Sequence, residues 1–227
     1  EVENIPYAYE ISDYDYIAGL KSFQDGMYQI QDISSMLAGE YTAPKAGDTI
    51  VDVCGAPGGK SINAALKMSE QGDCGRVIAR DLSDYKVALI DENIKRLNIT
   101  NIQTQVYDAL DCDESLINKA DIVIADLPCS GLGIIGRKPD IKYNASPEKL
   151  QSLVDLQRDI LKVVSRYVKS GGVLMYSTCT INRAENEDNA DWICKESGFT
   201  KDGEYHQLLP ANNSGMDGFF VARLIKN

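Results

Sequence analysis

The sequence TIVDVCGAPGGKSINAALKM, residues 49–68, is the most informative about the fold, because three kinds of local signal follow one another within it. Ile50, Val51 and Val53 are β-branched and predict a buried strand, whereas the sequence from Lys60 onward predicts a helix. The loop between them consists of Cys54, Gly55, Ala56, Pro57, Gly58 and Gly59. Such a unit points the amides and the positive dipole end of the helix toward whatever lies above the strand. We therefore expect a nucleotide-like ligand, the alternative being an ordinary turn of an α/β protein.

Strands and helices alternate along the rest of the chain. We predict further strands at residues 76–80, 101–106, 121–126, 172–178 and 218–225. Helices are predicted from about Asp32 to Tyr41, from Lys60 to the QGDCG turn, and at 82–97, 147–171 and 183–197. This alternation is typical of an α/β fold with a doubly wound, mostly parallel sheet, whose ligand lies at the carboxyl ends of the strands. Residues 1–27 are expected to form a small N-terminal extension of short strands or extended chain, and residues 28–227 the main domain.

The loop does not fit the two common phosphate-binding motifs. A P-loop requires glycine five residues before Gly59, where this chain has Cys54, and GxGxxG is also missing. Asp81, about 20 residues further on at the tip of a strand, can accept hydrogen bonds from ribose hydroxyls, or it can cap the next helix. Asp108, at the next strand tip, can accept from an adenine amino group or stabilise a turn. Acidic groups at successive strand tips, with no phosphate-binding lysine, favour S-adenosylmethionine over NAD or ATP.

The composition is that of a globular chain with one sizeable core, since 44% of the 227 residues are hydrophobic and 25% are charged. The net charge of −11, from 23 basic and 34 acidic residues, argues against tight nucleic-acid binding driven by phosphate neutralisation alone. No apolar run approaches the ~20 residues of a membrane span, and no signal peptide opens the sequence, so we expect a cytoplasmic protein without membrane contact. Because the sequence opens at Glu1 without a start signal, we expect it to belong to a longer chain.

Six cysteines contain no CxxC pair, and His206 is the single histidine, so neither a metal site nor a disulfide framework is expected. Most of them are expected to be structural, buried residues: Cys54, Cys74, Cys112 and Cys194. Cys129 in LPCSG and Cys179 in STCT are different, because each directly follows a predicted strand. Since these two strands should be neighbours in the sheet, we expect both thiols to face one pocket.

Several longer motifs occur in order over most of the chain: DGMYQIQDISS (25–35), DVCGAPGGKS (52–61), ADLPCSGLG (125–133), RKPDIKY (137–143), YSTCTINRAENE (176–187) and DGFFVARLIK (217–226). Together they resemble the RsmB/Sun-type RNA cytosine-5 methyltransferases of the NOP2/Sun group, with RKPDIKY and DGFFVARLIK closest to the RsmB branch. The resemblance implies a Rossmann-like, S-adenosylmethionine-dependent fold and methylation of carbon 5 of a cytosine in small-subunit 16S ribosomal RNA. It also implies an upstream NusB-like RNA-binding domain, of which residues 1–27 would be a remnant. One departure is Gly55, where the family usually has alanine.

The resemblance also assigns roles to individual residues. Cys179 is the expected nucleophile toward carbon 6 of cytosine, and Cys129 the group that assists release or proton removal. DNA cytosine-5 methyltransferases instead use a ProCys cysteine, which matches Cys129, so the division of roles stays open. Asp126 is expected to hold the cytosine edge or the cofactor, and Lys60 to orient the base or Asp126.

Binding residues follow from the same resemblance. The expected cofactor-binding residues are Cys54, Gly55, Ala56, Pro57, Gly58, Gly59, Lys60, Asp81, Asp108 and Asp126. Arg137, Lys138 and Lys142 are candidate RNA contacts, the alternative being ordinary surface charges. Two other functions stay open: an amino-group nucleic-acid methyltransferase, which would also use an Asp-x-Pro motif, and a non-catalytic RNA-binding or ribosome-assembly module.

Overall fold

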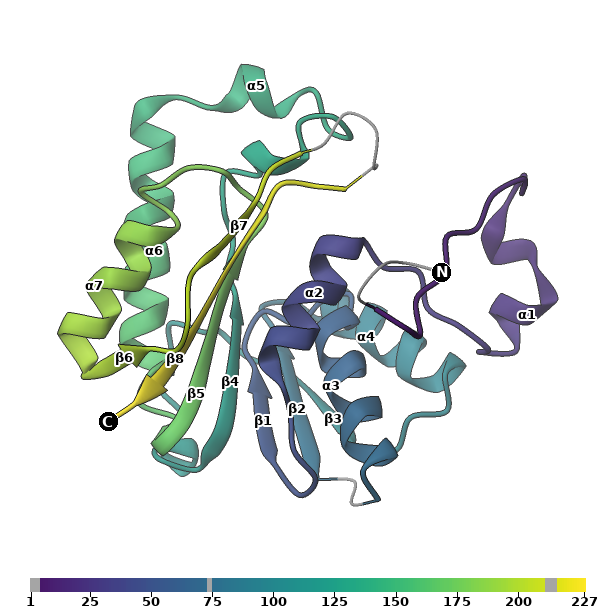
Figure 1. Ribbon diagram of the computed structural model, residues 1–227, viewed down its shortest axis with the longest axis horizontal. Coiled ribbons are helices and arrows are strands. Elements are labelled where there is room, and N and C mark those ends of the chain that lie inside the picture. The colour runs from purple at the N-terminus through teal and green to yellow at the C-terminus, as the bar shows by residue number, and fades with distance from the viewer. Residues whose placement is uncertain (1–4, 73–74, 211–215) are drawn as a thin grey trace.

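A mostly parallel sheet forms the centre of the molecule, as the computed structural model shows for residues 5–72, 75–210 and 216–227 (Figure 1). Its strand order is β3-β2-β1-β4-β5-β8-β6, with β7 also paired to β8. The strands are β1 (Thr49–Asp52), β2 (Arg76–Asp81), β3 (Ile102–Val106), β4 (Ala120–Asp126), β5 (Val168–Thr178), β6 (Phe199–Lys201), β7 (His206–Leu208) and β8 (Phe219–Lys226). The first five strands run parallel, and β8 is antiparallel to β5, β6 and β7. The predicted doubly wound α/β fold is confirmed.

Helices cover both faces of this sheet, with α2, α3 and α4 on one side and α6 and α7 on the other (Figure 1). The helices are α1 (Lys21–Gln24), α2 (Ile33–Thr42), α3 (Gly59–Glu70), α4 (Asp84–Arg96), α5 (Ile141–Asn144), α6 (Pro147–Val164) and α7 (Glu187–Ser197). Short 3-10 turns occur at Ile17–Gly19, Glu114–Leu116 and Leu132–Ile134. Among the described residues, no helix is both long and apolar enough to cross a membrane.

The sheet divides the core into two apolar layers, because successive side chains of a strand point to opposite faces. Ile50 of β1 packs with Ala38 of α2 and Met68 of α3. Its neighbour Val51 instead belongs to the layer that contains Leu161 of α6. Burial on both faces explains why the central residues of β1, β2 and β4 are apolar.

Local signals place several helix starts where the sequence predicts them. Asp32 caps α2 by accepting a hydrogen bond from the Ser34 amide at 2.9 Å. Ser146 caps α6 in the same way, and Pro147 occupies its first turn.

Other predicted boundaries are wrong. The helix predicted up to residue 171 ends at Val164, because β-branched Val168 instead pairs with Ala120 and begins β5. The helix predicted from Arg183 begins only at Glu187, after two turns. The N-terminal extension is irregular, extended chain over residues 8–16, as one of the two expected alternatives has it, but it forms short helical turns from Ile17 to Gln24. Residues 1–4 of the extension, and Cys74, lie outside the described residues.

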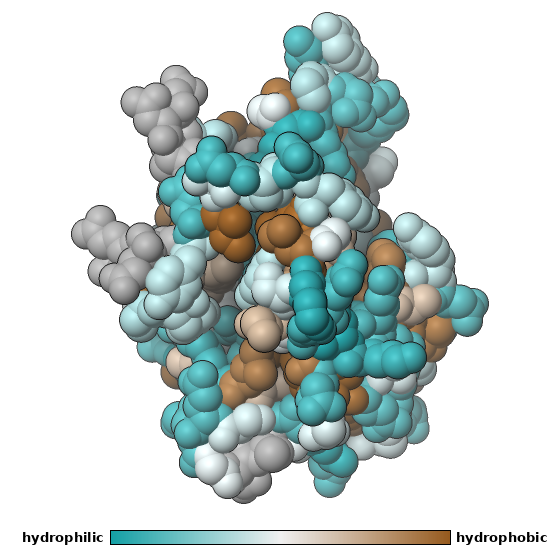
Figure 2. Space-filling model, turned by 90° about the vertical axis from the view of Figure 1, so that its right-hand side faces the viewer, coloured by the Kyte–Doolittle hydropathy of each residue, from teal (hydrophilic) through white to brown (hydrophobic). Residues whose placement is uncertain are grey.

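The molecular surface on the side of the N-terminal segment carries separate hydrophobic patches among hydrophilic side chains (Figure 2). The most exposed large apolar or aromatic side chains of the described residues include Tyr16, Met27, Tyr85 and Tyr143. Scattered exposure of this kind is ordinary for a folded domain.

Candidate active site

The glycine loop between β1 and α3 is held against the tip of β2. The Gly55 amide donates to the carbonyl of Arg80 at 2.8 Å, and the Ala56 amide donates to Oδ2 of Asp81 at 3.1 Å. Gly58 has φ +106°, and a Cβ there would lie 3.2 Å from Cδ1 of Ile62. Glycine is therefore required at position 58 by both backbone conformation and space.

Asp81 and Asp108 have different environments at their strand tips. Asp81 is 3% exposed, and its Oδ1 accepts from the Leu82 amide at 2.7 Å and pairs with Nζ of Lys86 at 2.9 Å. Asp108 accepts a hydrogen bond from the Leu110 amide at 2.9 Å. This contact stabilises a turn, which was the alternative to an adenine contact for this residue. A ligand role for either side chain remains a prediction.

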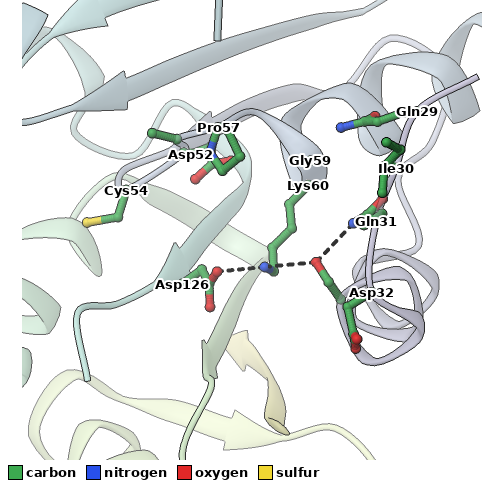
Figure 3. Close-up of a pocket in the computed structure, with 13 residues that line it drawn as sticks. Gln29, Ile30, Gln31, Asp32, Asp52, Cys54, Pro57, Gly59, Lys60 and Asp126 are labelled. Atoms are coloured by element: carbon green, nitrogen blue, oxygen red, sulfur yellow. Dashed lines mark hydrogen bonds and ion pairs between the residues drawn. The ribbon is translucent and has the colours of Figure 1, made fainter. Parts of the chain in front are cut away.

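A cavity of about 260 Å³ opens beside the loop, between the start of α3 and the segment that leads into α2 (Figure 3). Its lining combines the glycine loop with polar side chains: Gln29, Ile30, Gln31, Asp32, Ser35, Asp52, Cys54, Gly55, Ala56, Pro57, Gly59, Lys60 and Asp126. Most of the predicted cofactor residues are thus brought together around one space. Gly58, Asp81 and Asp108 do not line it.

Lys60 joins three elements at the floor of this cavity. Its Nζ pairs with Oδ2 of Asp126 at 2.6 Å and lies 3.3 Å from Oγ of Ser35 (Figure 3). The other carboxylate oxygen of Asp126 accepts from Oγ of Ser177 at 2.8 Å. This ion pair fits orientation of Asp126, one of the two roles expected for Lys60, and that role remains a prediction.

Asp52 is a site residue that the sequence analysis missed, although it opens the DVCGAPGGKS motif. Burial raises its pKa to about 7, although the hydrogen bond from Ser61 at 2.6 Å and the charge of Lys60 oppose the rise. Its Oδ1 is buried, and none of the described residues forms a hydrogen bond with it. A Cβ at Gly55 would lie 3.2 Å from this carboxylate, so the space for alanine there is tight.

The two candidate catalytic thiols lie at adjacent strand ends. Because β4 and β5 pair in parallel, with Asp126 opposite Ser177, the residues beyond them come together. Sγ of Cys129 lies 3.2 Å from Sγ of Cys179. The two thiols are therefore adjacent, as expected, and that both face one pocket remains a prediction.

The two thiols differ in acidity. The hydrogen bond with Cys129 lowers the pKa of Cys179 below its ordinary value, against the effect of burial, and the charge of Lys60 lowers it further. The same hydrogen bond, together with burial, raises the pKa of Cys129. Cys179 is consequently the thiol of the pair that loses its proton more readily, and the thiolate is the reactive form of cysteine.

The other described cysteines have structural surroundings. Burial raises the pKa of Cys54, and the nearby carboxylate of Asp52 adds to the rise. Cys112 and Cys194 pack against the core layer beside α6. Among the described residues, no group of three or more His, Cys, Asp or Glu side chains is arranged to hold a metal.

The three candidate RNA contacts differ in their surroundings. Arg137 forms ion pairs with Asp32 and, at 3.1 Å, with Asp217, so its guanidinium joins the loop after β4 to two other segments. Lys138 is exposed, and Nζ of Lys142 lies 4.8 Å from the centre of the Tyr143 ring. The two lysines fit an RNA contact better than Arg137 does.

The model of the family described as 16S rRNA methyltransferase RsmB/F matches residues 40–225. The chain belongs to this family. A Bacillus subtilis protein named probable ribosomal RNA small subunit methyltransferase B is 38% identical, over 92% of this chain and 50% of its own length. A Synechocystis protein with the same name is 34% identical, over 92% and 50%. The chain thus spans about half the length of the curated relatives it matches.

Solved structures give the same assignment for the fold. The crystal structure of PH0851 has a TM-score of 0.86 at 30% identity, over 95% of this chain and 50% of its own. NSun6 from Pyrococcus horikoshii, solved with SFG, has a TM-score of 0.82 at 28% identity, over 94% and 56%. The RsmB/Sun resemblance and the Rossmann-like methyltransferase fold are confirmed.

Proposed function

We propose that this chain is the catalytic part of an enzyme that methylates carbon 5 of a cytosine in small-subunit ribosomal RNA, with S-adenosylmethionine as methyl donor. The observation that carries the proposal is the thiol pair of Cys129 and Cys179, 3.2 Å apart at the ends of adjacent strands. Carbon 5 of cytosine is a weak nucleophile, so its methylation requires covalent activation by a nucleophile such as a thiolate. Methylation of an amino group requires no thiol nucleophile, so it would leave Cys179 without a role.

The residues around the cavity fit S-adenosylmethionine. Two carboxylates are buried here: Asp52 lines the cavity and Asp81 lies next to it. Oδ1 of Asp52, which has no hydrogen-bond partner among the described residues, can accept a hydrogen bond from the cationic methionine end. Asp81 is the candidate for the ribose hydroxyls and Asp108 for the adenine, at the neighbouring strand tip. When bound, the cofactor supplies an electrophilic methyl group. Its analogue SFG is present in the NSun6 structure, which supports the assignment.

The chain's own residues then act on the target base, which must be unstacked to enter the site. The Cys179 thiolate adds to carbon 6, and the electron pair of the C5=C6 bond becomes available at carbon 5. After methylation the proton on carbon 5 leaves to a base, the C5=C6 bond reforms, and the Cys179 thiolate is expelled. Cys129 assists this release. Asp126, oriented by Lys60 and Ser177, holds the polar edge of the cytosine.

The whole enzyme is proposed to contain more than this chain, because the matched relatives are about twice as long. We expect an upstream NusB-like domain to supply RNA affinity, since this chain carries a net charge of −11.

The test is a methylation assay with unmodified small-subunit RNA and isotopically labelled S-adenosylmethionine, followed by nucleoside analysis. We expect 5-methylcytidine as the labelled product, and no product from Cys179→Ala. Labelled N4-methylcytidine would instead establish an amino-group enzyme. Calorimetry gives the second arm: absence of S-adenosylmethionine binding would establish a non-catalytic RNA-binding module.

A further inference from the structure

One buried carboxylate joins the loop that carries Cys129 to the turn that follows Cys179. Glu185 is fully buried. Its Oε2 accepts from the backbone amide of Ser130 at 2.8 Å, and its Oε1 accepts from the Ser130 hydroxyl at 2.6 Å. Because Ser130 directly follows Cys129, both bonds fix the backbone next to this thiol.

Further donors reach Glu185 from the other side. Nδ2 of Asn182, three residues after Cys179, donates to Oε1 at 2.9 Å. Nε2 of Gln157 in α6 donates to Oε2 at 3.1 Å and also to the carbonyl of Pro128 at 2.9 Å. The backbone of Glu185 is held as well, since its carbonyl accepts from the hydroxyl of Tyr176 in β5.

The neighbouring hydroxyls complete the connection. Oγ of Ser130 lies 2.8 Å from Oγ1 of Thr180, which directly follows Cys179. Two residues adjacent in sequence to the thiols are therefore in direct contact, and Glu185 holds one of them in place.

A buried carboxylate is costly unless every oxygen is hydrogen-bonded. Four donors from the Cys129 loop, the Cys179 turn and α6 meet this requirement here, and the described residues place no Lys or Arg on the carboxylate. The two loops cannot move apart without removing donors from a buried charge. The carboxylate thus couples their positions more strongly than neutral hydrogen bonds would.

We propose that Glu185 is a positioning residue that sets the separation of the Cys129 and Cys179 thiols by binding Ser130 and Asn182. Glu185 contacts the loop after Cys129 and the turn after Cys179, and it affects the thiols only through these two segments. The catalytic consequence rests on the proposed function, whereas the thiol geometry does not.

The test measures thiol separation directly, by oxidation of the reduced protein with diamide. The N=N bond of diamide takes up two electrons and two protons from the thiols of Cys129 and Cys179, which form an S–S bond. Free thiols are then blocked with N-ethylmaleimide, and the linked peptides are quantified by mass spectrometry over time. We expect the wild-type chain to form this bond rapidly and Glu185→Gln to form it at least tenfold more slowly. In the variant, the NH2 group of the side-chain amide would replace one carboxylate oxygen and would face hydrogen-bond donors that it cannot accept from.

Matched variants separate positioning from general damage. Glu196→Gln, an exposed glutamate of α7, should leave the rate unchanged. Ser130→Ala and Asn182→Ala each remove one donor and should slow the reaction by a smaller factor, which tests the proposal even if Glu185→Gln does not fold. A folded Glu185→Gln with the wild-type rate, or wild-type rates in both single-donor variants, would overturn it.

The pH dependence of Cys179 alkylation separates a positioning role from a loss of stability, because a loss of stability alone would not shift it. Because Cys129 lowers the pKa of Cys179, separation of the thiols should move the alkylation profile of Cys179 to higher pH in Glu185→Gln. In the methylation assay the same variant should lower kcat with little change in KM. If the thiol measurements change as predicted and no chain methylates RNA, the positioning role stands and the proposed function fails.

Discussion

The hydrogen bond between the two thiols of Cys129 and Cys179 is the contact on which the proposed chemistry depends. Replacement of Cys129 by alanine removes the hydrogen bond that lowers the pKa of Cys179. Cys129→Ala should therefore shift the pH profile of Cys179 alkylation by iodoacetamide to higher pH and reduce its rate near neutrality. Peptide mass spectrometry measures this rate site by site, with Cys112 as internal reference. An unchanged profile would show that Cys129 does not activate Cys179.

Asp52 makes stability depend on pH. Because its pKa is raised to about 7 in the folded chain from 3.8, the folded chain holds the proton more tightly than the unfolded chain. This stabilising contribution is present below about pH 4 and is lost as pH rises through about 7. Relative to wild type, Asp52→Asn should gain on the order of 2 kcal/mol in unfolding free energy between pH 5 and pH 8.

Urea unfolding of both proteins at the two pH values checks this prediction. Titration of all other groups is common to the two chains and cancels in the comparison. If the difference between them is the same at pH 5 and pH 8, Asp52 does not titrate in this range.

A site residue could be predicted where the sequence immediately around it carries the information. Cys129 and Cys179 could be found because each follows a strand, and strand ends of a parallel sheet meet at one edge. Glu185 could not be found, since its Ser130 partner is 55 residues away in sequence. Asp52 lies inside a recognised motif, but its burial depends on packing that the motif does not reveal.

At the scale of elements, the loop after β4 is held by a close backbone contact. A Cβ at Gly133 would lie 2.1 Å from the carbonyl oxygen of Gly218 and 2.8 Å from that of Cys179. Gly133→Ala should therefore destabilise the fold by about 1–3 kcal/mol and slow formation of the diamide-induced bond between Cys129 and Cys179. Gly136→Ala is the control, because nothing lies within 4 Å of its Cβ. Equal unfolding free energies for the two variants would contradict the prediction.

Arg137 connects the same loop to α2 and β8 through Asp32 and Asp217. These ion pairs are partly exposed, so Arg137→Ala should cost about 0.5–1 kcal/mol of unfolding free energy. Lys138→Ala should cost less, and urea unfolding of both variants makes the comparison. A larger loss for Lys138→Ala would show that Arg137 does not join these segments.

The elements themselves were largely predictable where periodicity is strong. The runs at β1, β2, β4 and β5 are apolar because both of their faces are buried. The end of α6 before Val168 was not predictable. Val168 continues the apolar face of α6 and also suits a strand, and only its pairing with Ala120 makes it the start of β5. The three-residue strands β6 and β7 depend on pairing with β8 and leave no periodic signal.

At the scale of the whole molecule, the net charge of −11 limits RNA affinity. RNA binding by this chain should be weak and strongly salt-dependent. Lys138→Ala should reduce the slope of log affinity against log salt by about 0.7, as expected for one lost phosphate contact to a single strand. Lys119→Ala, at the opposite end of β4, is the control. Fluorescence anisotropy over a salt series gives the slopes, and equal slopes for both variants would exclude Lys138 from the RNA contact.

The carboxyl edge of the sheet brings together the two groups of residues that the proposed reaction requires. The cavity beside the glycine loop lies on one side of Asp126 and Lys60, and the thiols lie just beyond β4 and β5. The proposed cofactor and the proposed nucleophile thus belong to adjacent strand ends of a single rigid scaffold.

Covalent trapping on RNA identifies the nucleophilic cysteine directly. RNA containing 5-fluorocytidine cannot lose a proton from carbon 5, so a methylated adduct should persist on the nucleophile. Incubation with S-adenosylmethionine, followed by denaturing electrophoresis and peptide mapping, should locate this adduct on Cys179. The adduct should form with Cys129→Ala and be absent with Cys179→Ala. An adduct that persists in Cys179→Ala and disappears in Cys129→Ala would contradict the account.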